Sequence, residues 1–234
     1  MTKSAAVIFD MDGVIVDSEP RHEQAFLDVV RSLGYGDNHG LRFADYVGRS
    51  DQELWIDFVK KNRPRQTLEQ LLALKRQRVV EIIRREQPVF EGLPELLAGL
   101  APKFHLAVAS GSERVVVEEV LALKELRRFF SAVVTAGDVR QGKPAPDIFL
   151  RAADLLDTSP DHCWVIEDSK PGVAAGLAAG MRVIAITNTH PADELTHAHH
   201  VVKSYREIAE LLLAFSPQSP APTVSRSKRH VSRH

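Results

Sequence analysis

Two aspartates, Asp10 and Asp12, stand one residue apart directly after an apolar run at residues 5–9. A run rich in Val, Ile and Phe predicts a buried strand of a parallel sheet. Open α/β sheets build their sites at the carboxyl ends of such strands. A carboxylate pair there could bind a divalent cation and supply both a nucleophile and an acid or base. Because Asp and Gly also favour turns, an Asp-rich turn is the alternative for this pair alone.

Small polar residues and a lysine follow the next two predicted strands. Ser110 and Gly111 could bind phosphate through a hydroxyl and backbone N–H groups at a helix N-terminus. A serine cap of that helix is the alternative, and it is the role that we expect for Ser112. Lys143 lies between a glycine and prolines in an extended loop, where it could contact a phosphate and a carboxylate. Most loop lysines are only solvated.

Two adjacent acids, Glu167 and Asp168, follow a fourth apolar run. Acids that gather in a cleft repel one another unless a cation neutralises them. Oxygen ligands with open coordination positions suit Mg²⁺, which retains waters and binds through few carboxylates together with a substrate phosphate. Each signal is weak alone. Because all of them fall at the ends of alternating strands, together they predict one site for a cation and a phosphate.

A regular alternation of strands and helices positions these groups. Strands are expected at 5–9, 104–109, 131–135, 162–166, 181–186 and 200–202, and helices at 113–124, 146–156, 170–179 and 204–215. This order predicts an α/β fold, a Rossmann-like, doubly wound and mostly parallel sheet with helices on both faces.

A helical block separates the first two predicted strands. Helices are expected at 19–34, around Leu54 and Phe58, and at 67–86. We therefore expect a helical cap at 16–88, inserted after the first strand of an α/β catalytic core at 1–15 and 89–215. The segment 216–234 is rich in Ser and Pro, and a disordered basic tail is expected there.

Composition narrows the class of protein. The 234 residues carry a formal charge of −1, and the tail holds four basic residues and no acid, so the remainder is acidic and gives no sign of a nucleic-acid surface. The one cysteine, Cys163, lies in an apolar run and is expected to be a buried thiol. Without an apolar stretch of bilayer length or a signal peptide, we expect a cytoplasmic protein with no membrane partner. We also expect a monomer.

The combination resembles the haloacid dehalogenase superfamily over residues 5–215, nearly everything but the tail. Residues 142–149 and 166–169 are the most specific stretches, and residues 17–22 resemble the branch that contains sugar-phosphate phosphatases and β-phosphoglucomutases. The positions that match the four family motifs are 10–14 with Asp17 and Ser18, Ser110, Lys143, and Glu167 with Asp168.

The resemblance implies a role for each matched residue. Asp10 attacks phosphorus and forms an aspartyl-phosphate, and Asp12 protonates the leaving oxygen and then activates water. Mg²⁺ is held by the Asp10 carboxylate, the Asp12 backbone carbonyl and the pair Glu167 and Asp168. Ser110 and Lys143 hold the phosphoryl oxygens, with Gly111 beside them.

Cap residues distinguish phosphatases from mutases within this branch. The mutases place Lys and Arg around a cap glycine to bind a second phosphate, whereas this chain has Val47 and Asp51 at those positions. An aspartate there repels a distal phosphate. Arg49 could contact substrate or be a solvated arginine, and His22 matches a cap-hinge histidine or is a surface residue. We therefore expect a Mg²⁺-dependent phosphatase that hydrolyses a small sugar-phosphate monoester. The alternative is a β-phosphoglucomutase-like mutase.

Overall fold

The computed structural model describes residues 5–36, 38–46 and 51–214. Six parallel strands form one sheet in the order β3-β2-β1-β4-β5-β6. They are β1 Ala6–Phe9, β2 His105–Ala109, β3 Ala132–Val134, β4 Cys163–Glu167, β5 Arg182–Ile186 and β6 His200–Val202. The first strand is central, and the chain order reverses beside it. The predicted doubly wound α/β sheet is confirmed.

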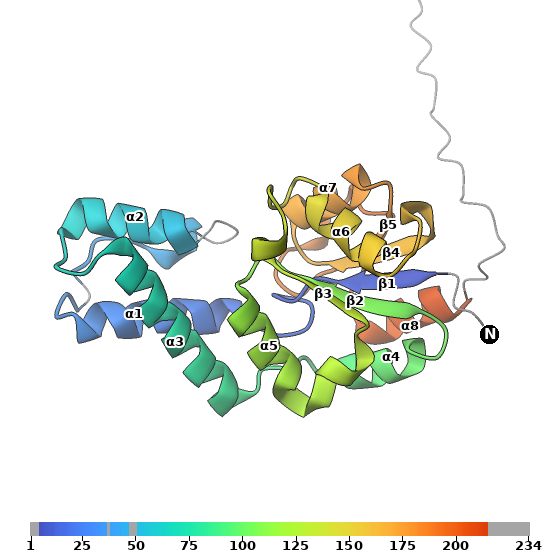
Figure 1. The fold of residues 1–234 in the computed structure, drawn as a ribbon, viewed down its shortest axis with the longest axis horizontal. Helices are drawn as coiled ribbons and strands as arrows, with labels where there is room; N and C mark the ends of the chain where they lie inside the picture. Colours follow the sequence, from blue (N-terminus) through green and yellow to red (C-terminus); the bar gives the residue numbers. More distant parts are fainter. Residues whose placement is uncertain (1–4, 37, 47–50, 215–234) are drawn as a thin grey trace, which may run out of the picture.

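Helices cover both faces of this sheet (Figure 1). The helices α4 Leu93–Leu100, α5 Arg114–Ala122 and α8 Tyr205–Ala214 pack on one face, and α6 Asp147–Leu155 and α7 Lys170–Ala178 pack on the other. Along β1 the side chains alternate between the two layers, because successive residues of a strand point to opposite faces. Val7 and Phe9 belong to one cluster, and Ala6 and Ile8 to the other.

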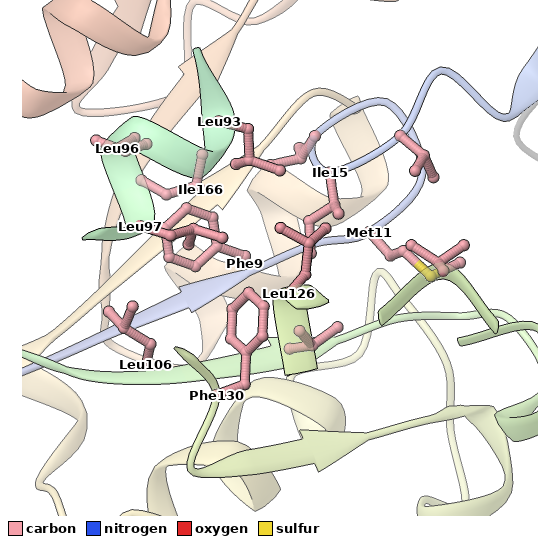
Figure 2. Packing of buried hydrophobic residues seen from close by; sticks show 14 of the residues in the cluster. Phe9, Met11, Ile15, Leu93, Leu96, Leu97, Leu106, Leu126, Phe130 and Ile166 are labelled. Carbon is pink, nitrogen blue, oxygen red and sulfur yellow. The ribbon is translucent and has the colours of Figure 1, made fainter. Parts of the chain in front are cut away.

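The larger cluster surrounds Phe9 (Figure 2). Its ring meets the edge of the Phe130 ring at a centroid distance of 6.0 Å, and Leu97 of α4 lies on the same side. Phe9 is fully buried and directly precedes Asp10. Packing of this ring therefore fixes the backbone that carries the first carboxylate.

Sequence analysis did not predict α4. Leu93–Leu100 contains Pro94. The proline lies in the first turn of the helix, where its missing N–H is not needed. Four 3₁₀ segments among the described residues of the core were also not predicted, at Leu123–Phe129, Ala136–Asp138, Pro160–His162 and Ala192–Glu194.

Between β1 and β2 the chain forms α1 Glu19–Ser32, a 3₁₀ segment Phe43–Tyr46, α2 Asp51–Asn62 and α3 Leu68–Glu86. These elements have a hydrophobic cluster of their own, centred on Phe26, Trp55 and Phe58. They extend to one side of the sheet, and the end of α3 reaches α5 (Figure 1). Thr67 and Gln70 form a capping box at the start of α3. Much of this helical part thus packs around a core of its own, whereas Ala25 of α1 and Val79, Ile82 and Ile83 of α3 belong to the larger cluster on the sheet.

The two connections to this helical part run side by side. Val16 and Val89 form an antiparallel bridge. The Asp17 N–H donates to the Pro88 carbonyl at 2.9 Å, and the Phe90 N–H donates to the Ile15 carbonyl at 3.2 Å. The helical part is therefore joined to the sheet by two antiparallel chain segments, and the bridge between them lies four residues after Asp12.

Substitution of Phe58 tests the packing of the hydrophobic cluster in the helical part. Phe58 is fully buried, and its ring meets that of Trp55 at 5.2 Å. We expect Phe58→Ala to lower the free energy of unfolding of this part by about 3–5 kcal/mol. Trp55 fluorescence would report it in a Trp164→Phe background, with Leu150→Ala, an exposed site, as control. An unchanged Trp55 transition would contradict the packing described here.

Candidate active site

Three predicted residues meet at the carboxyl ends of β1 and β4. The Lys143 ammonium donates to Asp10 Oδ1 at 2.5 Å and to Glu167 Oε1 at 2.6 Å. Asp10 and Glu167 lie at the ends of neighbouring central strands, whereas Lys143 comes from the loop before α6. All three side chains are nearly excluded from solvent. Parallel pairing of β1 and β4 thus brings the side chains of Asp10 and Glu167 together. Lys143 joins them from a loop that is 133 positions from Asp10 in the sequence.

Glu167 is held by the start of α7. Its Oε2 accepts hydrogen bonds from the Asp168 N–H at 2.8 Å, the Ser169 N–H at 2.9 Å and the Ser169 hydroxyl at 2.9 Å. Donors at a helix N-terminus stabilise a carboxylate. Gly172 is required above it, because a Cβ at that position would overlap with the Glu167 carboxylate. These contacts aim the other oxygen of Glu167 at Lys143.

Asp168 completes a group of three acids. One oxygen each of Asp10, Glu167 and Asp168 lie within 4.8 Å of one another. Asp168 is 5% exposed and accepts a hydrogen bond from the Thr189 hydroxyl. The Cα of Gly13, at φ +78°, lies so close that a side chain there would overlap with the Asp168 carboxylate. The Asp-Gly sequence after β1 therefore has a steric reason.

The charges of this group are unbalanced. Burial, together with the carboxylates of Glu167 and Asp10, raises the pKa of Asp168 to about 9. Burial also raises the pKa of Asp10 to about 7, although Lys143 opposes this shift. Burial would lower the pKa of Lys143, but its two carboxylate partners raise it. Three acids face one lysine, so an oxygen-ligated divalent cation fits this donor set in both charge and chemistry.

The Asp12 carboxylate has other partners than the three acids have. It accepts hydrogen bonds from Ser18 Oγ at 2.6 Å and Ser112 Oγ at 2.8 Å, and His22 Nε2 lies 3.8 Å away. Burial would raise the pKa of Asp12, but His22 and these hydroxyls lower it to about 2. Asp12 is therefore ionised and in the form that can accept a proton. Within the described residues, its carboxylate belongs to a second cluster that faces the helical part.

The expected cap role of Ser112 is wrong. The helix α5 begins at Arg114, and its N-cap residue is Glu113, whose side chain makes no capping hydrogen bond. The Ser112 hydroxyl instead donates to Asp12. Ser110 is fully buried and accepts a hydrogen bond from the Ser112 N–H at 3.0 Å, which closes a tight turn. Gly111, at the tip of that turn, is exposed. Phosphate binding by Ser110 and Gly111 stays a prediction.

A buried lysine links His22 to the second helix of the helical part. Lys75, on α3, is fully buried and lies 3.0 Å from His22 Nδ1, and it also pairs with Asp51. Sequence analysis did not single out Lys75. Its signal was its position on the apolar face of the predicted helix, between Leu71 and Val79. Arg49 lies outside the described residues, so its contact with substrate also stays a prediction.

Replacing one acid of the group tests the charge imbalance. The pKa of Asp168 rises from 3.8 to about 9 on folding, so its ionisation destabilises the metal-free protein increasingly as pH rises between these values. We expect Asp168→Asn to raise the Tm of EDTA-treated protein at pH 8, with each 1 kcal/mol giving about 2–4 °C. Mg²⁺ should no longer shift that Tm.

Asp154→Asn is the matched control, because the Asp154 side chain is 70% exposed and pairs with Arg151 on the surface of α6. It should leave both the Tm and the Mg²⁺ effect nearly unchanged. A lower Tm for Asp168→Asn, or a Mg²⁺-induced shift equal to that of wild type, would refute the proposed charge imbalance.

A family model described as haloacid dehalogenase-like hydrolase matches residues 7–186. Hexitol phosphatase B of Escherichia coli strain K12 is 35% identical over 188 residues, which cover 77% of this chain and 82% of that protein. The fructose-1-phosphate phosphatase of the same strain is 34% identical over 188 residues, which cover 78% of this chain and 96% of that protein.

Solved structures share the fold. CbbY from Rhodobacter sphaeroides in complex with phosphate aligns with a TM-score of 0.77 at 23% identity, covering 87% of this chain and 96% of that chain. A β-phosphoglucomutase from Clostridium difficile aligns with a TM-score of 0.70 at 22% identity, covering 90% and 99%. Among the described residues, no helix has the length and apolar character needed to span a bilayer.

Proposed function

Because the chain belongs to the haloacid dehalogenase-like hydrolase family, we propose that it is a Mg²⁺-dependent phosphatase that hydrolyses a small sugar-phosphate monoester. The resemblance drawn from the sequence motifs is thereby confirmed at the level of the family. The observation that carries the proposal is the buried contact of Lys143 with Asp10 beside two further acids. Asp10 can serve as a carboxylate nucleophile, and the Lys143 ammonium lies against it. Together with Asp10, Glu167 and Asp168 form an acidic group of the kind that binds a metal.

Asp10 and Asp12 divide the covalent chemistry between them in this proposal. Asp12 is ionised in the substrate-free protein and takes up a proton from solvent when the negatively charged phosphate monoester binds beside it. A carboxylate oxygen of Asp10 then attacks phosphorus, and the bond between phosphorus and the sugar oxygen breaks while that oxygen takes this proton from Asp12. Water then attacks the phosphorus of the aspartyl-phosphate, gives a proton to Asp12 and releases inorganic phosphate. The hydroxyls of Ser18 and Ser112 hold the ionised Asp12 for the second step.

The remaining residues hold the phosphate and the cation. Lys143 keeps its proton and offers positive charge to both Asp10 and a phosphoryl oxygen. Ser110 and Gly111, in the turn after β2, would bind the other phosphoryl oxygens. Asp10, Glu167, Asp168 and the Asp12 backbone carbonyl would hold Mg²⁺. Mg²⁺, when bound, would reduce the repulsion between the nucleophilic carboxylate and the phosphate.

The relatives guide the proposed substrate class. Two of them are named for phosphatases of a hexitol and of fructose 1-phosphate, which are small hydroxyl-rich monophosphates. The structural likeness to a β-phosphoglucomutase keeps a phosphosugar mutase as the second candidate. Asp51 favours the phosphatase, because its carboxylate pairs with Lys75 near His22 and would repel a second phosphate. The monomeric state and the cytoplasmic location stay predictions.

A phosphosugar panel tests the proposed activity. With Mg²⁺ we expect phosphate release from at least one hexitol or hexose monophosphate, with no activity in EDTA. Asp10→Asn should lower kcat by more than about 10³-fold, because no carboxylate nucleophile remains. The control is Asp154→Asn, which alters an acid far from the site. A folded protein inactive on every ester would refute the proposal. Glucose 6-phosphate formed from β-glucose 1-phosphate without phosphate release would favour the mutase.

A further inference from the structure

The segment after β5 contacts both halves of the active site. The Asn188 side-chain amide donates to the Gly13 carbonyl at 2.8 Å, and the Thr189 hydroxyl donates to the Asp168 carboxylate. Gly13 directly follows Asp12, and Asp168 belongs to the three-acid group. Two adjacent side chains, about 175 positions from Asp12, thus reach the acid–base loop and the metal-binding acids together.

Gly13 is fixed through both of its peptide groups. Its N–H donates to the Val16 carbonyl at 2.8 Å, and its carbonyl accepts from Asn188. The N–H of Gly13 shares a peptide plane with the carbonyl of Asp12. Because Gly13 has φ +78° and lacks a Cβ, its backbone could adopt other conformations without these hydrogen bonds. The orientation of the Asp12 carbonyl therefore depends on how firmly Gly13 is held.

Tyr205 extends this contact to the next residue of the loop. Asn188 donates its second amide hydrogen bond to the Tyr205 hydroxyl at 3.0 Å, and that hydroxyl donates to the Val14 carbonyl at 2.7 Å. Tyr205 is the first residue of α8 and is nearly buried. Val14 is fully buried, so within the described residues its carbonyl depends on the tyrosine for a partner. The start of α8 and the end of β5 therefore hold two consecutive carbonyls of one loop.

We propose that Asn188, supported by Tyr205, is a positioning residue that orients the Asp12 backbone carbonyl toward the bound cation. The inference rests on the proposed function, since it assigns a task within the same site. Asn188 touches no reacting group in this assignment and acts only through the Gly13 peptide. Removing partners that orient metal ligands costs about 10–100-fold in metal affinity or activity in other proteins.

The exposure of Asn188 allows its positioning role to be distinguished from a role in stability. Asn188 is exposed, so loss of its amide should cost little free energy of unfolding. Asn188→Ala removes both donors, and Asn188→Asp keeps the size but places an acceptor against the Gly13 carbonyl. Thr187→Ala is the matched control: its hydroxyl donates to Val202 at 3.3 Å, in the same segment but away from the loop.

The test measures Mg²⁺ affinity without substrate by isothermal titration calorimetry, and kcat and KM for p-nitrophenyl phosphate at saturating Mg²⁺. We expect both Asn188 variants to bind Mg²⁺ about 10–100-fold more weakly and to lose kcat, with KM within about threefold of wild type. Tyr205→Phe should act in the same direction, and its combination with Asn188→Ala should be less than additive. Thr187→Ala should match wild type in both measurements.

Wild-type Mg²⁺ affinity and kcat in both Asn188 variants would overturn the proposal, as would equal losses in Thr187→Ala. The two proposals can fail separately. If the wild-type protein hydrolyses no phosphate ester, the proposed function fails, whereas the comparison of Mg²⁺ affinities still decides whether Asn188 orients the loop.

Discussion

Three carboxylates are buried together beside a single lysine, and the surrounding structure must accommodate their repulsion. Asp10, Glu167 and Asp168 are almost fully excluded from water, and Lys143 supplies the nearby ammonium that pairs with two of them. Such a group is costly to bury without a cation, and its raised pKa values at Asp10 and Asp168 express that cost. Functional sites often retain this kind of destabilising arrangement because the chemistry needs it. The surrounding elements must therefore hold the acids together against their repulsion.

The parallel sheet provides most of that restraint. The ends of β1 and β4 are neighbours through main-chain pairing, so the positions of Asp10 and Glu167 follow from the ladder and from the packing of Phe9 and Ile166 beneath them. The N-terminus of α7 holds Glu167, and Gly172 leaves room for its carboxylate. Asp12, the proposed acid–base residue, depends on a different set of contacts. Asp12 faces hydroxyls and His22 at the boundary with the helical part, so movement of that part would alter its surroundings.

Much of this arrangement follows from sequence patterns because strand ends of a parallel sheet converge. Apolar runs located the strands, and the polar residues after them located the acids and Lys143. Features that depend on tertiary contacts could not be derived in the same way. The helix at Leu93–Leu100 has a proline in its first turn, and Ser112 bonds Asp12 across about 100 positions instead of capping its own helix. Lys75 and Asn188 gain their meaning only from partners on other elements. Arg49, for which we predict a contact with substrate, lies outside the described part of the chain.

The most direct measurement is calorimetric titration of the substrate-free protein with Mg²⁺ at pH 7.5 in buffers of different ionisation enthalpy. A cation that enters this group must displace the proton that Asp168 binds while its pKa is about 9. The account therefore predicts one Mg²⁺ per chain and a heat that varies with the buffer in the direction of proton release. A heat that is independent of the buffer, or no binding at millimolar Mg²⁺, would contradict the central claim that three buried acids compete for protons and one cation.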